Sequence, residues 1–442
     1  MAVQKPLRLL ESARPISQPD CVHQAMQEKT NSRLFLLLFL ATLAAFGPFV
    51  TDFYLPTLPE QTTDFRTTPA LVQLGLSTTM WGLAAGQLFV GPISDKTGRR
   101  KPLAWCLLIF TLSTLGTALA PTIWMFLAMR FLEGLGASGA IVMSRSVAAD
   151  RYTGRELGSF MAVMGAIQGI APISAPLLGA LVAAHVGWRG IFWILFAAGV
   201  ALLLITVFVL AETHPRSRAE MRADAGTAPA HENECAETLE ASARILFTDP
   251  VFVAIVIQQF LSSAILFGHI SSSPFILRGH FGLSSEAYGL IFGGMALSLA
   301  VGATLSSRFA DPLKALAVGA FGMLAGSAIL AASFAADISF AGVLPSYVVV
   351  LFSLGLTLPA AMTAALTLHR KRSGFAAAVL GAVSFVGGGL VAPFTAMGDA
   401  RACLCAIFLA SAALLVALSL WLGRHMRLEA ARGQAVDFSG GR

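Results

Sequence analysis

Charged residues are scarce in this sequence, and long polar segments are scarcer still. Only 12% of the 442 residues are charged, 56% are hydrophobic, and the mean hydropathy is +0.74. A water-soluble domain of this size is not built in this way, which excludes a soluble enzyme. The net charge of +6 does not indicate nucleic acid, because the Lys and Arg residues stand between apolar runs and therefore mark membrane topology.

Cysteines and cofactor-binding motifs are also few. No P-loop motif is present, which argues against a pump driven by ATP hydrolysis, and no cofactor is expected. Residues 1–33 are polar and contain no apolar core, so we do not interpret them as a cleavable signal peptide. The cysteines are scattered and show neither a disulfide framework nor metal-ligand spacing: Cys21, Cys106, Cys235, Cys403 and Cys405.

Apolar runs of 18 or more residues recur along the chain, and each can cross a hydrocarbon core of about 30 Å. The sequence predicts an all-α integral membrane protein with these twelve spans: 34–58, 70–94, 102–120, 122–145, 157–183, 189–211, 251–277, 285–308, 314–335, 339–368, 375–397 and 400–423. A channel would show a repeated pore motif and a sensor a sizeable soluble domain, and the sequence shows neither.

One polar stretch divides the spans six and six, as in transporters built from two parallel bundles. The expected organisation is a tail (1–33), a first six-helix bundle (34–211), a central loop (212–249), a second six-helix bundle (250–423) and a second tail (424–442). Cations concentrate in both tails and in alternate loops, which places both termini in the cytoplasm. We therefore expect a multi-pass protein of a bacterial cytoplasmic membrane.

Ionisable residues inside spans are the first candidates for function, because they are costly in lipid and usually face a cavity or a partner. Asp52 lies in the first span, and burial would make its carboxyl group a candidate proton carrier. Arg130 and Glu133 are three apart in the fourth span and share a helix face. The alternatives are a solvated interfacial Asp and an ion pair with a purely structural role.

Polar residues at the midplane of both halves are candidates for binding a substrate. Such a site would lie between the two bundles. His269 is interpreted as a core residue rather than a ligand. The candidates are Asp52, Tyr54, Gln73 and Gln168 in the first half, and Gln258, Gln259 and Ser262 in the second.

The loop 91–101, GPISDKTGRRK, holds an Asp and four cations between two apolar runs. It is either a basic turn that only sets topology or a latch between neighbouring helices, and Asp150 could pair with Arg99 across it. In the fifth span, Gly and Pro residues provide a smooth face that can bend and slide. The candidates for conformational gating are Gly91, Asp95, Gly98, Arg99, Arg100, Arg145, Asp150, Gly169, Pro172 and Pro176.

Several of these stretches resemble motifs of one known family. The loop 91–101 resembles the signature loop of the major facilitator superfamily. The segment RFLEGLG at 130–136 resembles the fourth-span motif of its proton-driven exporters. TDFYLPTLP at 51–59 resembles the first-span motif of the bicyclomycin- and chloramphenicol-resistance (Bcr/CflA) branch.

The resemblance implies proton-coupled efflux of small drug-like molecules, such as phenicol- or bicyclomycin-type antibiotics, by a monomer in the lipid bilayer. The partners would be the substrate and protons, without nucleic acid. Two positions depart from the family pattern, since Glu133 replaces the usual Gln and Ala171-Pro172 replaces Gly-Pro. A proton-coupled exporter of a metabolite such as an amino acid or a sugar is the alternative.

Overall fold

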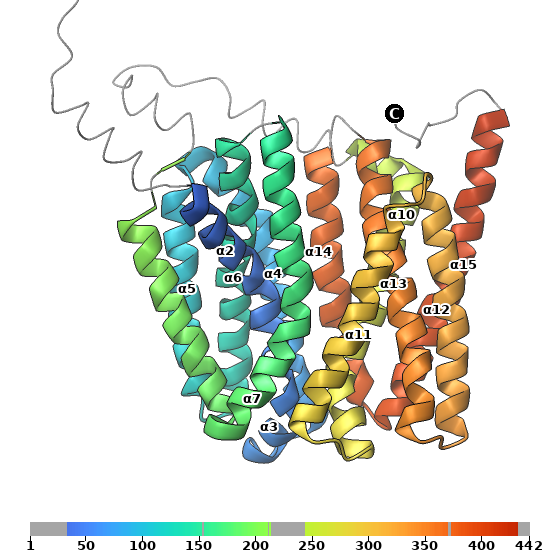
Figure 1. Cartoon of the computed structure of the whole chain (residues 1–442), viewed down its shortest axis with the longest axis horizontal. Coiled ribbons are helices and arrows are strands. Elements are labelled where there is room, and N and C mark those ends of the chain that lie inside the picture. Colours follow the sequence, from blue (N-terminus) through green and yellow to red (C-terminus); the bar gives the residue numbers. More distant parts are fainter. Residues whose placement is uncertain (1–32, 153, 211, 214–243, 370–372, 432–442) are drawn as a thin grey trace, which may run out of the picture.

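The computed structural model describes residues 33–152, 154–210, 212–213, 244–369 and 373–431. These residues form helices joined by short connections, and no strand occurs among them (Figure 1). The start of the first described helix and the end of the last one lie on the same side, toward the top of Figure 1. We call this side the termini side and the opposite one the far side.

The first half contains the spans that precede the central loop. Several of its helices start at a side-chain cap, and Thr68 and Thr122 each accept a backbone N–H of the first turn. The elements are α2 (Arg33–Asp52), η1 (Leu55–Thr57), α3 (Leu58–Asp64), α4 (Pro69–Thr97), α5 (Arg100–Ala118), α6 (Ile123–Arg151) and α7 (Gly154–Phe208).

The long α7 is two spans joined by a sharp corner. Gly187 interrupts it with φ +69°, a left-handed conformation that glycine adopts without the steric cost of a Cβ atom. The fifth and sixth spans predicted at 157–183 and 189–211 therefore correspond to the two arms of α7. Pro172 and Pro176 lie inside the first arm.

The second half repeats the six-span plan. Its elements are α10 (Pro250–Ser273), η2 (Pro274–His280), α11 (Ser285–Ser306), α12 (Pro312–Ala335), α13 (Phe340–Leu368), α14 (Ser373–Val391), η4 (Ala392–Ala396) and α15 (Ala400–Ala431). The last helix extends beyond the predicted limit of 423. Ten described stretches are long and apolar enough to cross a membrane, and counting α4 and both arms of α7 gives the predicted twelve spans.

Two helix pairs join the halves, because α4 packs against α14 and α7 against α11. Within the first half, α4 and α6 pack backbone to backbone. A Cβ atom added to Gly134 would lie 2.0 Å from the carbonyl oxygen of Thr79, so only glycine permits this contact. The close packing of α6 fixes the positions of its ionisable side chains.

Candidate functional site

The centre of the first half holds a fully buried ion pair. Arg130 and Glu133 both lie on α6, and both side chains have 0% exposure. Arg130 Nη1 donates to Glu133 Oε2 over 2.9 Å. The predicted pairing of these residues is therefore present. Since neither group reaches solvent, each charge depends on the other for compensation.

Arg130 also connects α6 to the far end of the first span. Its Nη2 donates to the carbonyl oxygen of Val50 over 3.0 Å, and its Cζ lies 4.4 Å from the centroid of the Tyr54 ring. Thr117 on α5 approaches Glu133 Oε2 at 3.5 Å. The pair therefore holds α2, α5 and α6 together, and a change in its charge would reach all three helices.

Asp52 is the last residue of α2 and is only 4% exposed. Its carboxylate interacts electrostatically with Tyr288 of the second half, so it lies near the boundary between the halves. Tyr288 in turn hydrogen-bonds Ser273 through the two hydroxyl groups, which are 3.0 Å apart. Asp52 is thus a buried acid of the first half that lies close to residues of the second half.

Several polar atoms in this cluster have no partner at good hydrogen-bond geometry among the described residues. They are Asp52 Oδ1, Tyr54 Oη, Arg130 Nε and Glu133 Oε1. Buried polar atoms are nearly always hydrogen-bonded, and an unmade bond is costly. Two carboxyl oxygens without a donor can accept a proton or a hydrogen bond from a ligand, which is the chemistry that a proton-coupled transporter requires.

Gln73 was predicted to bind substrate, but in this conformation both ends of its amide group are occupied. Its Nε2 donates to the Ser271 carbonyl oxygen over 3.0 Å, and its Oε1 accepts from Thr395 Oγ1 over 2.8 Å. Gln73 belongs to the first half and both partners to the second. It therefore acts as a polar bridge between the halves in this conformation, and its role in binding substrate stays a prediction.

Arg278 forms a second bridge on the same side. It makes an ion pair with Glu60 over 2.9 Å and also donates to the carbonyl oxygen of Pro56. Both acceptors belong to the first half, whereas Arg278 follows α10 in the second. With the Gln73 bridge, these contacts hold the two halves together toward the far side.

The predicted polar residues of α10 separate into two groups. Gln258 donates to Ser419 of α15 over 2.7 Å, and α15 packs on α12 and α10 rather than on the first half. Gln258 is thus bonded within the second half in this conformation, and its role in binding substrate stays a prediction. Gln259 donates to Ser384 of α14 over 2.7 Å, a helix that faces the first half. Ser262 is buried.

The charged stretch 91–101 on the termini side was predicted as a loop, but only Gly98 and Arg99 lie between α4 and α5. It forms a compact network. Arg99 Nε donates to Asp150 Oδ2 over 2.8 Å, and Arg99 Nη1 donates to Ser94 Oγ over 2.7 Å. This is the pairing of Arg99 with Asp150 that we predicted. Gly98, with φ +88°, turns the chain so sharply that a Cβ atom would lie 2.7 Å from Glu212 Oε2.

Glu212 is a residue of this network that the sequence did not reveal. It accepts the backbone N–H groups of Arg99 (2.8 Å) and Arg100 (3.1 Å) at the start of α5. Arg100 Nε in turn donates to the Thr206 carbonyl oxygen over 3.2 Å. A carboxylate at a helix N-terminus is favourable, but Glu212 lies over a hundred residues away in the sequence. The network thus ties the ends of α4, α5, α6 and α7.

Other predicted gating residues are placed only in part. Gly91 lies within α4, and Arg145 lies on α6 with an exposed side chain. The side chains of Asp95 and Gln168 and the surroundings of Gly169 fall outside the described part of the structure. Their predicted roles stay predictions.

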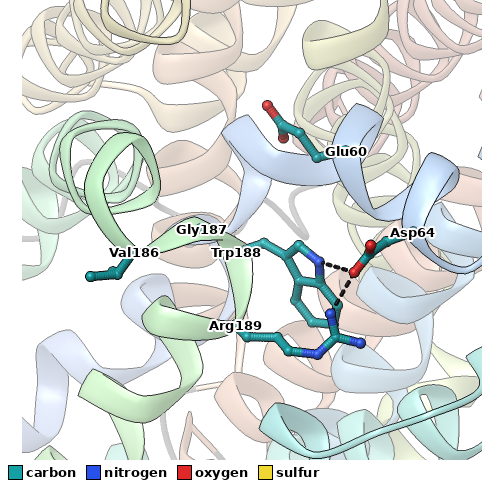
Figure 2. Close-up of a pocket in the computed structure, with 6 residues that line it drawn as sticks. All are labelled: Glu60, Asp64, Val186, Gly187, Trp188 and Arg189. Atoms are coloured by element: carbon teal, nitrogen blue, oxygen red, sulfur yellow. Dashed lines mark hydrogen bonds and ion pairs between the residues drawn. The ribbon is translucent and has the colours of Figure 1, made fainter.

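A pocket of about 280 Å³ opens on the far side, between α3 and the corner of α7 (Figure 2). Trp188 Nε1 donates to Asp64 Oδ2 over 2.9 Å, and Arg189 pairs with the same oxygen. The guanidinium of Arg189 also lies 4.1 Å from the Trp188 ring centroid. These contacts use the polar groups of the pocket to fasten α3 to α7, so we assign the pocket a structural role.

Metal binding finds no support in the described ranges, where no group of three or more His, Cys, Asp or Glu could hold an ion. The fold and the buried ionisable cluster define a class, that of secondary transporters with two six-helix bundles. Residues 34–393 match the model of the Major Facilitator Superfamily. The chain belongs to this superfamily.

The sequences of two similar proteins support this assignment to the superfamily. The chain is 31% identical over 375 residues to an uncharacterized MFS-type transporter, YdgK, of Bacillus subtilis, covering 84% of this chain and 90% of that protein. It is 30% identical over 366 residues to the multidrug resistance protein MdtL of Escherichia coli, covering 80% and 86%.

Solved structures share the fold. A bacterial homologue of the human lysosomal transporter Spinster, in an inward-facing and unoccupied conformation, aligns with a TM-score of 0.67 at 19% identity, over 89% of this chain and 96% of that one. A D-xylose-proton symporter aligns with a TM-score of 0.67 at 16% identity, over 87% and 97%. At these identities the likeness shows the fold alone.

Proposed function

We propose that this transporter is a proton-coupled exporter of small drug-like molecules, such as phenicol- or bicyclomycin-type antibiotics, within the Bcr/CflA branch. The observation that carries the proposal is the buried cluster of Asp52, Arg130 and Glu133, with two carboxyl oxygens that lack a donor. The printed name of MdtL, a multidrug resistance protein, supports drug-like molecules as the substrate class.

The proposed mechanism assigns the far side to the outside of the cell and both termini to the cytoplasm of a bacterium, following the distribution of cations. The Gln73 and Arg278 bridges then close the path to the outside, and a monomer opens alternately to either side. Protons and drug each favour one access state, so each shifts the population that the other requires.

Asp52 has the central place in this cycle, because it is a buried acid that interacts electrostatically with the second half. When the far-side bridges open, the carboxyl group would meet water and exchange its proton there. The Arg130–Glu133 pair would respond to the same movement through the Val50 carbonyl and the Tyr54 ring. Protonation at the end of α2 and drug binding between the halves are then competing events, as antiport requires.

The test is drug efflux from cells of a pump-deficient host, followed by transport in everted vesicles with an imposed pH gradient. A susceptibility panel first identifies the compound with the largest change. We expect Asp52→Asn to bind that compound but to lose gradient-driven accumulation, and Glu133→Gln to lose less and to shift the pH dependence. Asp337→Asn is the matched control, since this acid is exposed and lies in a far-side turn.

Full gradient-driven efflux by both single variants and by their double variant would show that neither Asp52 nor Glu133 carries the proton. A panel without any change in susceptibility would instead point to the metabolite exporter. The control keeps these outcomes separate from a general effect of removing one negative charge.

A further inference from the structure

The second half contains a buried imidazole that the proposed mechanism does not use. His269 lies on α10 and is 2% exposed. Its ring stacks on Phe292 of α11, with centroids 5.5 Å apart and an interplanar angle of 11°, and lies 5.3 Å from the Tyr347 ring of α13. Three helices of the second half therefore meet at this ring.

Two polar atoms at this point have no hydrogen-bond partner among the described residues. They are His269 Nδ1 and Tyr347 Oη. A histidine that serves only to pack would be expected to satisfy its buried nitrogen, because leaving it unpaired is costly. The aromatic packing explains the position of the ring, but it does not explain why these two polar atoms are present without a hydrogen-bond partner.

The position of His269 repeats that of Asp52. Asp52 stands four residues before Pro56, the proline of η1, and His269 stands five before Pro274, the first residue of η2. The first and seventh spans hold the same place in their six-helix halves. The position of His269 in the second half therefore corresponds, within one residue, to the position of Asp52 in the first half.

The partner of His269 is repeated in the same way. Arg130 follows Thr122, the N-cap residue of α6, by eight residues, and Tyr347 follows Ser339, the N-cap residue of α13, by eight. These are the fourth span of each half. In the first half Arg130 contacts the residues around Asp52, and in the second Tyr347 contacts His269. Two independent helices therefore give the same correspondence.

The surroundings of His269 contain titratable groups. Tyr347 faces it from α13, and Cys405 of α15 acts electrostatically on Tyr347. From α11, Tyr288 stacks near Phe292 and bonds Ser273.

Farther out, Arg278 of η2 is paired with Glu60, and η4 contributes the uncharged Thr395. From the first half, the Asp52 carboxylate reaches Tyr288 rather than the imidazole. The ring contacts described for His269 are both aromatic, with Phe292 and Tyr347.

We propose that His269, with Tyr347, is a second proton-exchanging site, located in the second half at the place that corresponds to Asp52. The inference rests on the proposed function and extends it from one proton site to two. The site is too enclosed for a drug molecule, since both side chains are at most 2% exposed, so its ligand is a proton delivered by water.

The exchange consists of two steps. When the helices around His269 separate, water enters and a hydronium ion transfers its proton to a ring nitrogen: the O–H bond breaks, an N–H bond forms and a water molecule is left. Tyr347 Oη then accepts a hydrogen bond from the ring. When the half opens to the other side, that N–H bond breaks and the proton returns to water. A buried imidazolium without a counter-charge is costly, so proton uptake requires the separation that alternating access provides, and it is coupled to transport for this reason.

The experiment counts protons in the purified full-length protein. The drug selected in the susceptibility panel is added at saturating concentration, and proton release is measured with a pH-sensitive dye. His269→Phe keeps an aromatic ring against Phe292 but cannot exchange a proton. Tyr347→Phe removes only the hydroxyl group. His185→Phe is the control, because this exposed His bonds only the Leu181 carbonyl oxygen of its own helix. Thermal unfolding and gel filtration establish that each variant folds.

We expect two protons per drug for the wild type and the control, and one for His269→Phe. In vesicles with the membrane potential clamped, the attainable drug ratio per pH unit should fall from about 100-fold to about 10-fold, since each proton contributes a factor of about ten per unit. Tyr347→Phe should slow the exchange and leave the count at two. A wild-type count in His269→Phe, together with a reduced count in Asp52→Asn, would overturn the second site alone. Absence of release from the wild type would overturn the proposed function itself.

Discussion

The buried Arg130–Glu133 pair makes a sharp prediction about the stability of the first half. Replacing Arg130 by Met removes the cation and keeps an unbranched side chain of similar length. The Glu133 carboxylate then loses its 2.9 Å donor and keeps only neutral hydroxyl groups of α5 beside it, those of Thr114 and Thr117. The Arg130 and Glu133 side chains are both fully buried, so solvent screening does not reduce the stability that is lost with the ion pair.

The expected cost follows from the geometry. Breaking one side of a buried pair leaves an uncompensated charge, at about 3–5 kcal/mol. Glu133→Gln should cost less, because the amide oxygen still accepts from Arg130, and the guanidinium keeps the Val50 carbonyl and the face of Tyr54. The double variant Arg130→Met/Glu133→Leu removes both charges together and should be more stable than Arg130→Met alone.

The assay is thermal unfolding of the purified variants in one detergent, followed by gel filtration of the heated samples. The predicted order of Tm is wild type, Glu133→Gln and the double variant above Arg130→Met. Equal Tm values for Arg130→Met and the double variant would show that the unpaired charge is not the source of the loss. The pair would then be a packing feature whose charges make no net contribution.

Three further predictions concern the ends of the helices. Asp150→Asn should preserve membrane insertion and lower the transport rate, because the ion pair with Arg99 is lost; wild-type rates in a vesicle assay would contradict a gating role. Gln73→Ala should increase the labelling of far-side cysteines by an impermeant thiol reagent. Gln258→Ala should not, because of these two residues only Gln73 bridges the halves. Cysteines placed at exposed positions 185 and 307, in a Cys-free version, should be labelled from outside the cell at 185 only, and the reverse result would invert the proposed orientation.

The sequence predicted the parts of the site that depend on local spacing. Arg130 and Glu133 pair because three residues along a helix place two side chains on one face. The limits of the spans followed from apolar runs and from turn residues, although the end of the last helix did not. There α15 extends to Ala431, since its last turns contain helix-forming residues that are not apolar.

The parts that depend on distant partners could not be predicted in this way. Gln73 and Gln258 are both amides in apolar helices, but one bridges the halves and the other bonds Ser419 inside the second half. Their difference depends on which helix lies opposite each of them. Glu212 looked like the first residue of a polar loop, and only the packing of α7 against α5 reveals that it caps α5. Hydropathy does not encode either fact.

The buried charges of this transporter are distributed unequally, and this has an electrical consequence. Among the described residues, the buried Asp, Glu, Lys and Arg side chains all belong to the first half. A membrane voltage does work on charge at about 2.3 kcal/mol per elementary charge per 100 mV. The membrane voltage therefore acts mainly on groups of the first half. The buried core of the second half carries no side-chain charge among the described residues unless His269 is protonated. A step in which the first half carries Asp52 across part of the field should depend on voltage, and a step confined to the second half should not.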